Sequence, residues 1–247
     1  APRPYDQSDT KAKIPALFHS LESLGDSEKY TRHFDPTVDV GLRDHSIDGV
    51  PLLPGVLGVE LMTQAASHFA QSPATGLMEV EFSSPIKFFD SRSMDVSVEV
   101  CQLGADSVST EVVTYFKRPN GKMMRRVHFK STVLTGPPGS VPDRPGRLEM
   151  PRDPGLSSTS IYSRYFHGPA FQVLADVSRL GEDGVELEMD LDRAQWLRDY
   201  QLDGFVTEPH MREAGFQAAG IWEMAELSRM GLPAAIDHVY LSSNPIP

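Results

Sequence analysis

The stretch Glu60-Leu-Met-Thr-Gln64-Ala65-Ala66 recurs in the second half of the chain as Glu213-Ala-Gly-Phe-Gln217-Ala218-Ala219. The two copies lie about one small domain apart, which is the spacing expected when a domain has been duplicated and fused. Only the first copy follows a loop with a histidine, His45-Ser-Ile-Asp-Gly49-Val-Pro-Leu-Leu-Pro54-Gly55. This asymmetry predicts two similar lobes that together build one acid/base site.

The composition is that of an ordinary globular protein. The 247 residues, 40% of them apolar, are enough for one large domain or two fused small ones. The net charge of −11 argues against a nucleic-acid partner, because phosphate binding needs an excess of Lys and Arg. The sequence lacks a run of about 18 apolar residues, so we expect no membrane span. Cys101 is the only cysteine, so we expect no disulfide, no metal site and a cytoplasmic location.

Turn-forming residues divide the chain into four predicted parts. Residues 1–29 are typical of a linker or N-terminal extension and lack the apolar core of a signal peptide. Residues 30–134 form a first lobe that carries His45, and residues 158–247 form a second lobe. The linker between them, 135–157, is rich in Pro and Gly and is not expected to hold a helix or a central strand.

Each lobe is predicted to pair a buried helix with antiparallel strands. Fewer residues follow the second Glu-x-x-x-Gln motif than follow the first within its lobe, so the second lobe is expected to lack strands or to have lost them at the C-terminus. The expected helices are 55–71, 158–165 and 209–230, and the expected strands are 77–89, 94–103, 107–117, 123–134, 170–179 and 184–190.

The surroundings of His45 fit a base that acts beside a carbonyl group. A histidine before the Pro54-Gly55 turn is held near the start of a helix, where free N–H groups and the helix dipole favour negative charge. Such a place suits a carbonyl oxygen that gains charge as a proton leaves the neighbouring α-carbon. A carboxylic acid on the opposite side would then protonate a departing β-hydroxyl, and Glu213 and Glu60 are the candidates.

Three segments in order resemble the dehydratase domains of polyketide synthases. They are the His45-x-x-x-Gly49-x-x-x-x-Pro54 motif, the segment Tyr165-Phe-His-Gly168-Pro169-Ala-Phe171-Gln172, and the segment Glu208-Pro209-His-Met-Arg-Glu213-Ala-Gly-Phe-Gln217. The resemblance runs from about residue 30 to 247. The residues around Phe-His-Gly-Pro resemble the dehydratases of iterative enediyne or polyunsaturated fatty acid synthases more than those of modular synthases. It implies an α+β double hot dog fold, in which two antiparallel sheets each wrap around a central helix.

The resemblance implies a reaction and a division of roles. A dehydratase of this family eliminates water from a 3-hydroxyacyl chain on an acyl carrier protein to give the trans-2-enoyl product, with His45 as base and Glu213 as acid. In single hot dog dehydratases, which are homodimers, the histidine and a glutamate come from different subunits, so His45 is expected to meet Glu213 and Glu60 to face a vestigial site. The residues expected to bind or shape the substrate channel are Gly49, Pro54, Gly55, Tyr165, Gly168, Pro169 and Gln217.

Two departures from the family pattern affect the acid. Glu213 stands where modular synthases have Asp, and Glu208 stands where they have His. The alternative role of Glu213 is a helix carboxylate paired with Arg212 or solvent, and that of Glu60 is a capping or hydrogen-bonding group. Tyr165 is expected to donate to the β-hydroxyl, to line the substrate channel or to pack as a core aromatic residue. For the mechanism, burial is expected to raise the pKa of the Glu213 carboxyl, opposed by any charge on His45.

The resemblance also implies partners and leaves other functions open. No metal or organic cofactor is expected, because the substrate is carried on the phosphopantetheine arm of an acyl carrier protein. That carrier protein and the neighbouring synthase domains are the expected partners, and a homodimer is left open. The alternatives are a product-template-type aldol cyclase, a catalytically degenerate scaffold or acyl-binding hot dog, and, as a weaker option, a hot dog thioesterase.

Overall fold

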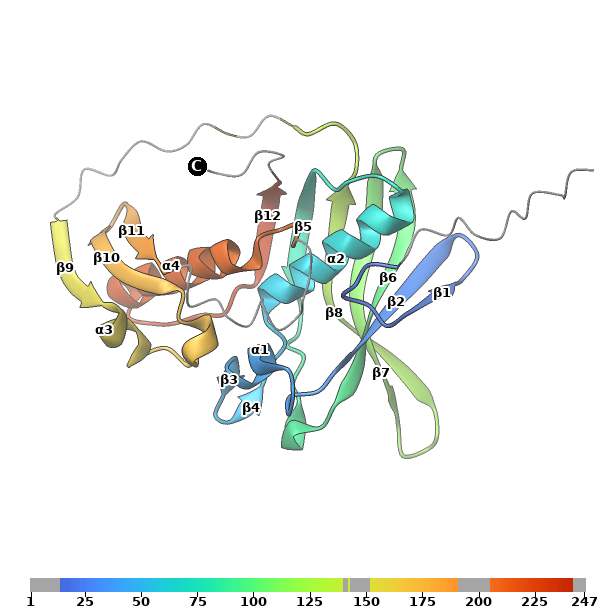
Figure 1. The fold of residues 1–247 in the computed structure, drawn as a ribbon, viewed down its shortest axis with the longest axis horizontal. Helices are drawn as coiled ribbons and strands as arrows, with labels where there is room; N and C mark the ends of the chain where they lie inside the picture. Colours follow the sequence, from blue (N-terminus) through green and yellow to red (C-terminus); the bar gives the residue numbers. More distant parts are fainter. Residues whose placement is uncertain (1–13, 140–141, 143–151, 191–204, 242–247) are drawn as a thin grey trace, which may run out of the picture.

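The computed structural model describes residues 14–139, 142, 152–190 and 205–241. Figure 1 shows a long curved sheet wrapped around helix α2 (Gly55–Ala70) and a smaller sheet against helix α4 (Pro209–Leu227). The two helices contact each other at the junction of the two halves. The fold is therefore α+β with antiparallel sheets around two helices, as the sequence predicts.

The first sheet has seven antiparallel strands and encloses α2. Every residue of the helix from Val56 to Ala66 is buried, including the polar stripe formed by Glu60, Thr63 and Gln64. Burial of a side chain such as Leu61 stabilises the fold by about 1.5–3 kcal/mol. A Cβ atom at Gly58 would collide with the Phe129 ring, so this glycine lets the helix lie directly on the sheet. In spatial order the strands are β1 (Ser20–Ser23), β2 (Ser27–Phe34), β6 (Met94–Gly104), β7 (Ser107–Lys117), β8 (Met123–Leu134), β5 (Gly76–Phe82) and β12 (Ala235–Tyr240).

The second half forms a smaller layer around α4. Its described strands make a three-stranded sheet in the order β11-β10-β9. Apolar residues of this sheet, of α3 and of α4 share a separate small core that includes Ile161, Val177 and Ile221. The elements are β9 (Arg152–Ser157), α3 (Ser158–Tyr162), the 3-10 turn η2 (Pro169–Phe171), β10 (Leu174–Gly181) and β11 (Gly184–Met189).

The strand after α4 belongs to the first sheet rather than to the second. Strand β12 pairs antiparallel with β5, with Ala235 opposite Glu81 and Tyr240 opposite Gly76. The chain thus returns to the first half after its long helix, which a sequence pattern without pairing information does not reveal.

Several predicted boundaries differ from the observed ones. Strands β1 and β2 begin before residue 30, and β9 lies inside the predicted linker, where a proline is tolerated because β9 is an edge strand. The expected strand 77–89 stops at Phe82, and the expected strand 170–179 begins only at Leu174, after the 3-10 turn. Parts of the predicted extension, linker and second lobe lie outside the described residues, and the division into two lobes stays a prediction.

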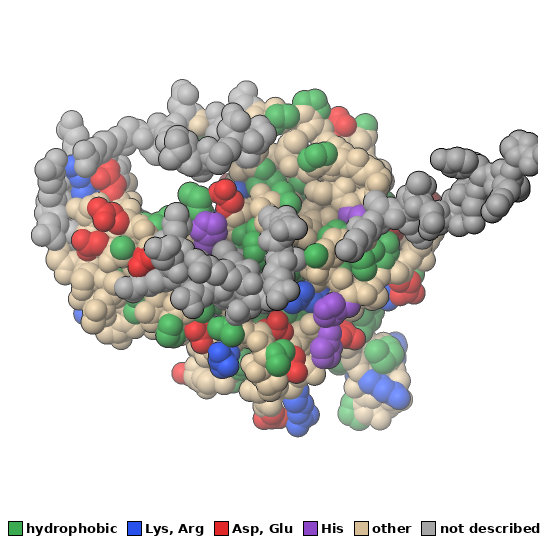
Figure 2. Space-filling view, in the orientation of Figure 1, with side chains coloured by type: hydrophobic (Ala, Val, Ile, Leu, Met, Phe, Trp, Pro, Cys, Tyr) green, Lys and Arg blue, Asp and Glu red, His purple; other side chains and the backbone are tan. Residues whose placement is uncertain are grey.

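The described residues on the face shown in Figure 2 do not form a broad basic patch. On the face in Figure 2, Lys and Arg side chains of the described residues lie singly or beside acidic ones rather than in one broad patch. On strand β8 the side chain of Arg125 pairs with Glu99 and Glu111 of the neighbouring strands. Within the described ranges, none of the helices is long and apolar enough to span a membrane.

Candidate active site

A small hairpin positions His45 beside the start of α2. Helix α1 (Val40–Arg43) ends just before it, and strands β3 (Ser46–Ile47) and β4 (Val50–Pro51) follow. The turn between these strands has positive φ at both Asp48 (51°) and Gly49 (76°), the geometry that favours glycine in tight hairpins. The hairpin returns the chain so that Leu52 N donates to His45 O at 2.9 Å. The loop is therefore closed on itself and holds the histidine backbone in place.

A second loop, from the other half of the chain, is fastened to the histidine loop. Gly168 N donates to Asp44 O at 2.7 Å, and Ala170 N donates to Asp44 Oδ2 at 2.9 Å. His45 and His167 form an isolated antiparallel β-bridge at the same place. A Cβ atom on Gly168 would lie 2.9 Å from the Asp44 side chain, so only glycine allows this approach. The two halves of the chain are thereby fixed relative to each other at the site.

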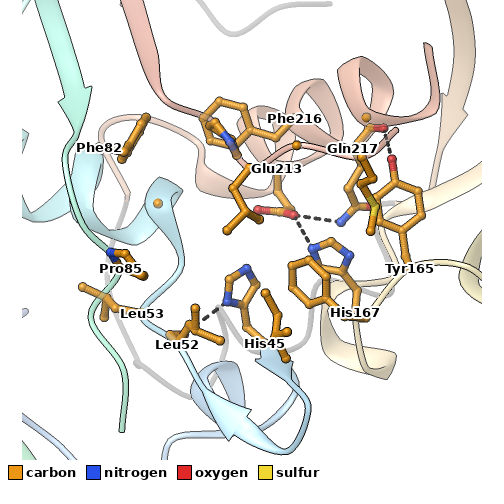
Figure 3. A pocket seen from close by; sticks show the side chains of 18 of the residues that line it. His45, Leu52, Leu53, Phe82, Pro85, Tyr165, His167, Glu213, Phe216 and Gln217 are labelled. Carbon is orange, nitrogen blue, oxygen red and sulfur yellow. Dashed lines mark hydrogen bonds and ion pairs between the residues drawn. The ribbon is translucent and has the colours of Figure 1, made fainter. Parts of the chain in front are cut away.

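Both candidate catalytic residues line one cavity between the halves (Figure 3). His45 comes from the loop before α2, and Glu213 comes from the first turns of α4. Most of the remaining wall is apolar, which suits a hydrocarbon chain. The other lining residues are Ile47, Leu52, Leu53, Gly55, Phe82, Pro85, Phe129, Tyr165, Phe166, His167, Phe216, Gln217, Gly220, Met230, Gly231, Leu232 and Pro233.

The imidazole of His45 is held neutral, and its Nε2 has no hydrogen-bond partner among the described residues. Its Nδ1 lies 3.1 Å from Leu52 O, and since a carbonyl oxygen only accepts, Nδ1 carries the hydrogen and Nε2 keeps its lone pair. Burial lowers the pKa of His45 to about 4, although the neighbouring Glu213 carboxylate opposes this shift. At neutral pH His45 is therefore an unprotonated base.

The carboxyl group of Glu213 has an environment that the sequence predicted only in part. Burial raises its pKa, as expected, but the hydrogen bond from His167, the charges that His167 and His45 carry when protonated, and the hydrogen bond from Gln217 outweigh this and lower the pKa overall. The expectation of a raised pKa was therefore wrong, because it left out the donors on the carboxyl group. Gln217 Nε2 donates to Glu213 Oε1 at 2.9 Å and so orients the carboxyl group.

Two tyrosines hold Gln217 in turn. Tyr162 donates from its hydroxyl to Gln217 Oε1 at 2.7 Å, and Gln217 Nε2 also donates to Phe171 O at 2.9 Å. Tyr165 donates to the main-chain oxygen of Gln217 at 2.5 Å, and burial raises the pKa of this phenol. Tyr165 thus lines the cavity with its hydroxyl already engaged by the helix.

The other predicted residues separate into cavity walls and backbone supports. Gly55 lines the cavity, whereas Gly49, Pro54, Gly168 and Pro169 do not and act through the conformation of their loops. Pro54 is the residue before α2, and Pro169 starts the 3-10 turn after the clamp on Asp44.

Glu60 lies outside the cavity, fully buried, and binds the chain just before α4. Its carboxyl group accepts from Gln64 Nε2, Val206 N, Thr207 N and Thr207 Oγ1 at 2.6–2.9 Å. This is the hydrogen-bonding role weighed for Glu60 as the alternative to a vestigial site. Arg212, in turn, donates to Tyr240 O at 3.3 Å rather than pairing with Glu213.

His167 is the site residue that the sequence analysis missed. Its Nε2 lies 3.1 Å from Glu213 Oε1, and both side chains are almost completely buried. The signal was present, because His167 directly precedes Gly168 in a motif already recognised. The sequence pattern, however, does not indicate that His167 contacts Glu213, which follows much later in the chain.

Comparison with protein families assigns both halves to one kind of protein. Residues 15–115 match the model described as polyketide synthase dehydratase domain, and residues 140–247 match the one described as polyketide synthase dehydratase N-terminal domain. The chain belongs to the polyketide synthase dehydratase family. The family assigns this dehydratase domain a hydro-lyase function in a polyketide synthase. A comparison with curated proteins gave no match.

Solved structures of dehydratase domains share the double hot dog fold. A trans-AT polyketide synthase dehydratase domain from Brevibacillus brevis is 18% identical, with a TM-score of 0.67, and the match covers 91% of this chain and 80% of that chain. The dehydratase domain from the CurF module of curacin polyketide synthase is 17% identical, with the same TM-score and coverage of 92% and 83%. The dehydratase domain from the terminal module of the rifamycin polyketide synthase is 20% identical, with a TM-score of 0.66 and coverage of 91% and 80%.

Proposed function

We propose that this dehydratase domain eliminates water from a 3-hydroxyacyl thioester on an acyl carrier protein, with His45 as the base and Glu213 as the acid. The observation that carries the proposal is the position of these two groups, one from each half of the chain, on one apolar cavity. Acid/base catalysis needs both groups within reach of one bound substrate, and each transfer typically contributes about 10²–10⁴-fold.

In the proposed reaction His45 Nε2 takes a proton from the α-carbon of the acyl chain. The electrons of that C–H bond form the double bond between the α- and β-carbons, and the bond from the β-carbon to the hydroxyl oxygen breaks. The oxygen leaves as water after it accepts a proton from Glu213. Because the pKa of Glu213 is lowered, the reactive form of the site is the fraction of molecules in which this carboxyl group is protonated. The proton gained by His45 then returns to the carboxylate, which restores both groups for the next turnover.

The start of α2 offers a place for the thioester carbonyl. Gly55 lines the cavity as the first residue of the helix, and the first helical N–H groups are without an intrahelical acceptor. Within the described part of the chain, the N–H groups of Gly55 and Val56 have no acceptor. Donors aimed at this position stabilise the charge that develops on the carbonyl oxygen as His45 removes the proton.

The proposed partners follow from the substrate. The acyl chain arrives on the phosphopantetheine arm of an acyl carrier protein, and the apolar walls, among them Phe82, Phe129 and Phe216, would surround it. We propose that neighbouring synthase domains deliver the chain in the cytoplasm and that the groups named above act without a metal or organic cofactor.

The test is a direct assay of the isolated domain with 3-hydroxybutyryl and 3-hydroxyhexanoyl chains on a carrier protein, followed by mass spectrometry of the intact carrier. The proposal expects loss of one water with the thioester retained. Release of free carrier thiol would instead identify a thioesterase. No water loss from either chain, together with cyclisation of a carrier-bound polyketone, would replace the proposal with an aldol cyclase.

A further inference from the structure

His167 lies beside Glu213, the acid of the proposed reaction, and has no part in the steps proposed above. His167 Nε2 lies 3.1 Å from Glu213 Oε1, with 5% and 4% of the two side chains exposed. Gln217 Nε2 reaches the same oxygen at 2.9 Å. Among the described residues, both donors to the carboxyl group therefore converge on Oε1, and Oε2 has no hydrogen bond from the protein (Figure 3).

We infer that His167 is a positioning residue that holds Glu213 with Oε2 towards the substrate and stabilises the carboxylate left when Glu213 gives up its proton. The inference rests on the proposed function for the identity of the reaction. The contact between the two side chains is independent of that function. Two N–H donors fixed on Oε1 favour the ionised carboxyl group and so make Glu213 a stronger acid.

The unpartnered nitrogen of His167 indicates how its ring is protonated. Nδ1 is buried and has no hydrogen-bond partner in the part of the chain that the structure describes. A doubly protonated ring would bury an N–H at Nδ1 without an acceptor among the described residues, and a buried donor without a partner costs about 1–3 kcal/mol. The neutral ring with its hydrogen on Nε2 leaves only a lone pair at Nδ1 and donates to Glu213 Oε1.

The His167 ring is fixed by its neighbours rather than free to turn. It stacks on Phe166 at 4.2 Å between ring centroids, with an angle of 26° between the planes. The adjoining Gly168 is tied to Asp44, and the main chain of His167 is bridged to His45. The loop thus delivers a donor to Glu213 in a set direction. The other titratable groups that face the pair are His45 and Tyr165.

The proposed step remains balanced with His167 in this role. The proton that leaves with the hydroxyl oxygen comes from Glu213 Oε2, and the negative charge that remains is shared with Oε1. His167 keeps its own hydrogen throughout and passes none to the substrate. The α-proton held by His45 returns to the same carboxylate at the end of the cycle.

Two variants separate a donor from a simple packing residue. His167→Phe keeps an aromatic ring against Phe166 but removes the donor, whereas His167→Gln keeps an N–H donor at a similar reach and cannot be charged. We expect His167→Phe to lower kcat about tenfold or more, consistent with the loss of a hydrogen bond to a charged group, and His167→Gln to recover most of it. Equal kcat for wild type and His167→Phe would overturn the inference.

A second readout does not depend on turnover. The Glu213 carboxyl group is titrated by NMR in protein labelled with ¹³C at the glutamate side chains, with Glu213→Gln used to assign its signal. In His167→Phe we expect the titration to move up by about one pH unit, and in His167→Gln to stay near wild type. A shift without any dehydration by wild type would uphold the role of His167 and reject the proposed function. Dehydration by wild type without a titration shift in His167→Phe would uphold the proposed function and reject the role of His167.

Discussion

Glu60 and Glu213 occupy the same position in a repeated Glu-x-x-x-Gln helix motif, yet their carboxyl groups have different partners. Each accepts a hydrogen bond from the glutamine one turn later, Gln64 at 2.6 Å and Gln217 at 2.9 Å. Glu60 then binds the chain before α4, while Glu213 meets His167 and lines the cavity. One copy of the motif therefore stabilises the junction of the halves, and the other supplies a reactive group.

The same substitution in the two copies should have opposite effects. Glu60→Gln leaves an amide N–H₂ facing donors that the carboxylate now accepts, so we expect a loss of about 1–3 kcal/mol in unfolding free energy with kcat close to wild type. Glu213→Gln keeps the shape but removes the acid, so we expect kcat to fall about 10²–10⁴-fold. Denaturant unfolding and single-turnover assays measure the two effects. A folded Glu60→Gln protein without activity would contradict this division.

The imidazole of His45 should titrate far below an ordinary histidine. Burial lowers its pKa from 6.5 to about 4, so the ring stays neutral throughout the physiological range. NMR of the histidine ring protons, with His45→Gln used for assignment, should show a signal that moves only near pH 4. A midpoint near 6.5 would mean that His45 is exposed to solvent and would remove the physical basis for its role as a buried base.

The same pKa predicts how stability changes with pH. Between pH 6.5 and 4 the unfolded chain binds a proton at His45 that the folded protein does not, so acidification favours unfolding in this window. The shift corresponds to a loss of roughly 3 kcal/mol in unfolding free energy. Denaturant unfolding at several pH values should show a shallower pH dependence for His45→Gln than for wild type. Identical pH dependence would show that His45 does not titrate differently on folding.

The clamp between Gly168 and Asp44 should be sensitive to a single methyl group. Gly168→Ala would place Cβ 2.9 Å from the Asp44 side chain, so the two loops must separate. We expect a destabilisation of about 1–3 kcal/mol together with reduced kcat, because the loops carry His45 and His167. Gly121→Ala is the control, since Gly121 has φ of 81° in a turn remote from the cavity and should affect stability alone. Equal activity losses in both variants would point to general destabilisation.

Local patterns predicted much of the fold. The helix expected over 55–71 is observed as Gly55–Ala70, and the strands expected over 107–117 and 123–134 are observed with the same bounds. These segments carry clear periodicity and are bounded by turn residues. The crossing of β12 to β5 was not foreseen, because strand pairing depends on contacts between residues that lie far apart in the sequence.

The candidate site was predictable as a set of residues but not as a set of contacts. The motifs singled out His45, Glu213 and Gln217, and the structure places all three on one cavity. The direction of the pKa shift of Glu213 depends on which donors surround the carboxyl group. The donor from His167 is visible only in three dimensions. Gly168, expected to bind or shape the substrate channel, fastens the two loops together and does not line the cavity.

The most direct test of the central claim is the single-turnover rate of water loss from a carrier-bound 3-hydroxyacyl chain in His45→Ala, Glu213→Gln and the double variant. If the two residues act as one acid/base unit, each single variant loses at least about 10²-fold and the double variant is hardly slower than the worse single one. A folded single variant that keeps the wild-type rate would contradict the account.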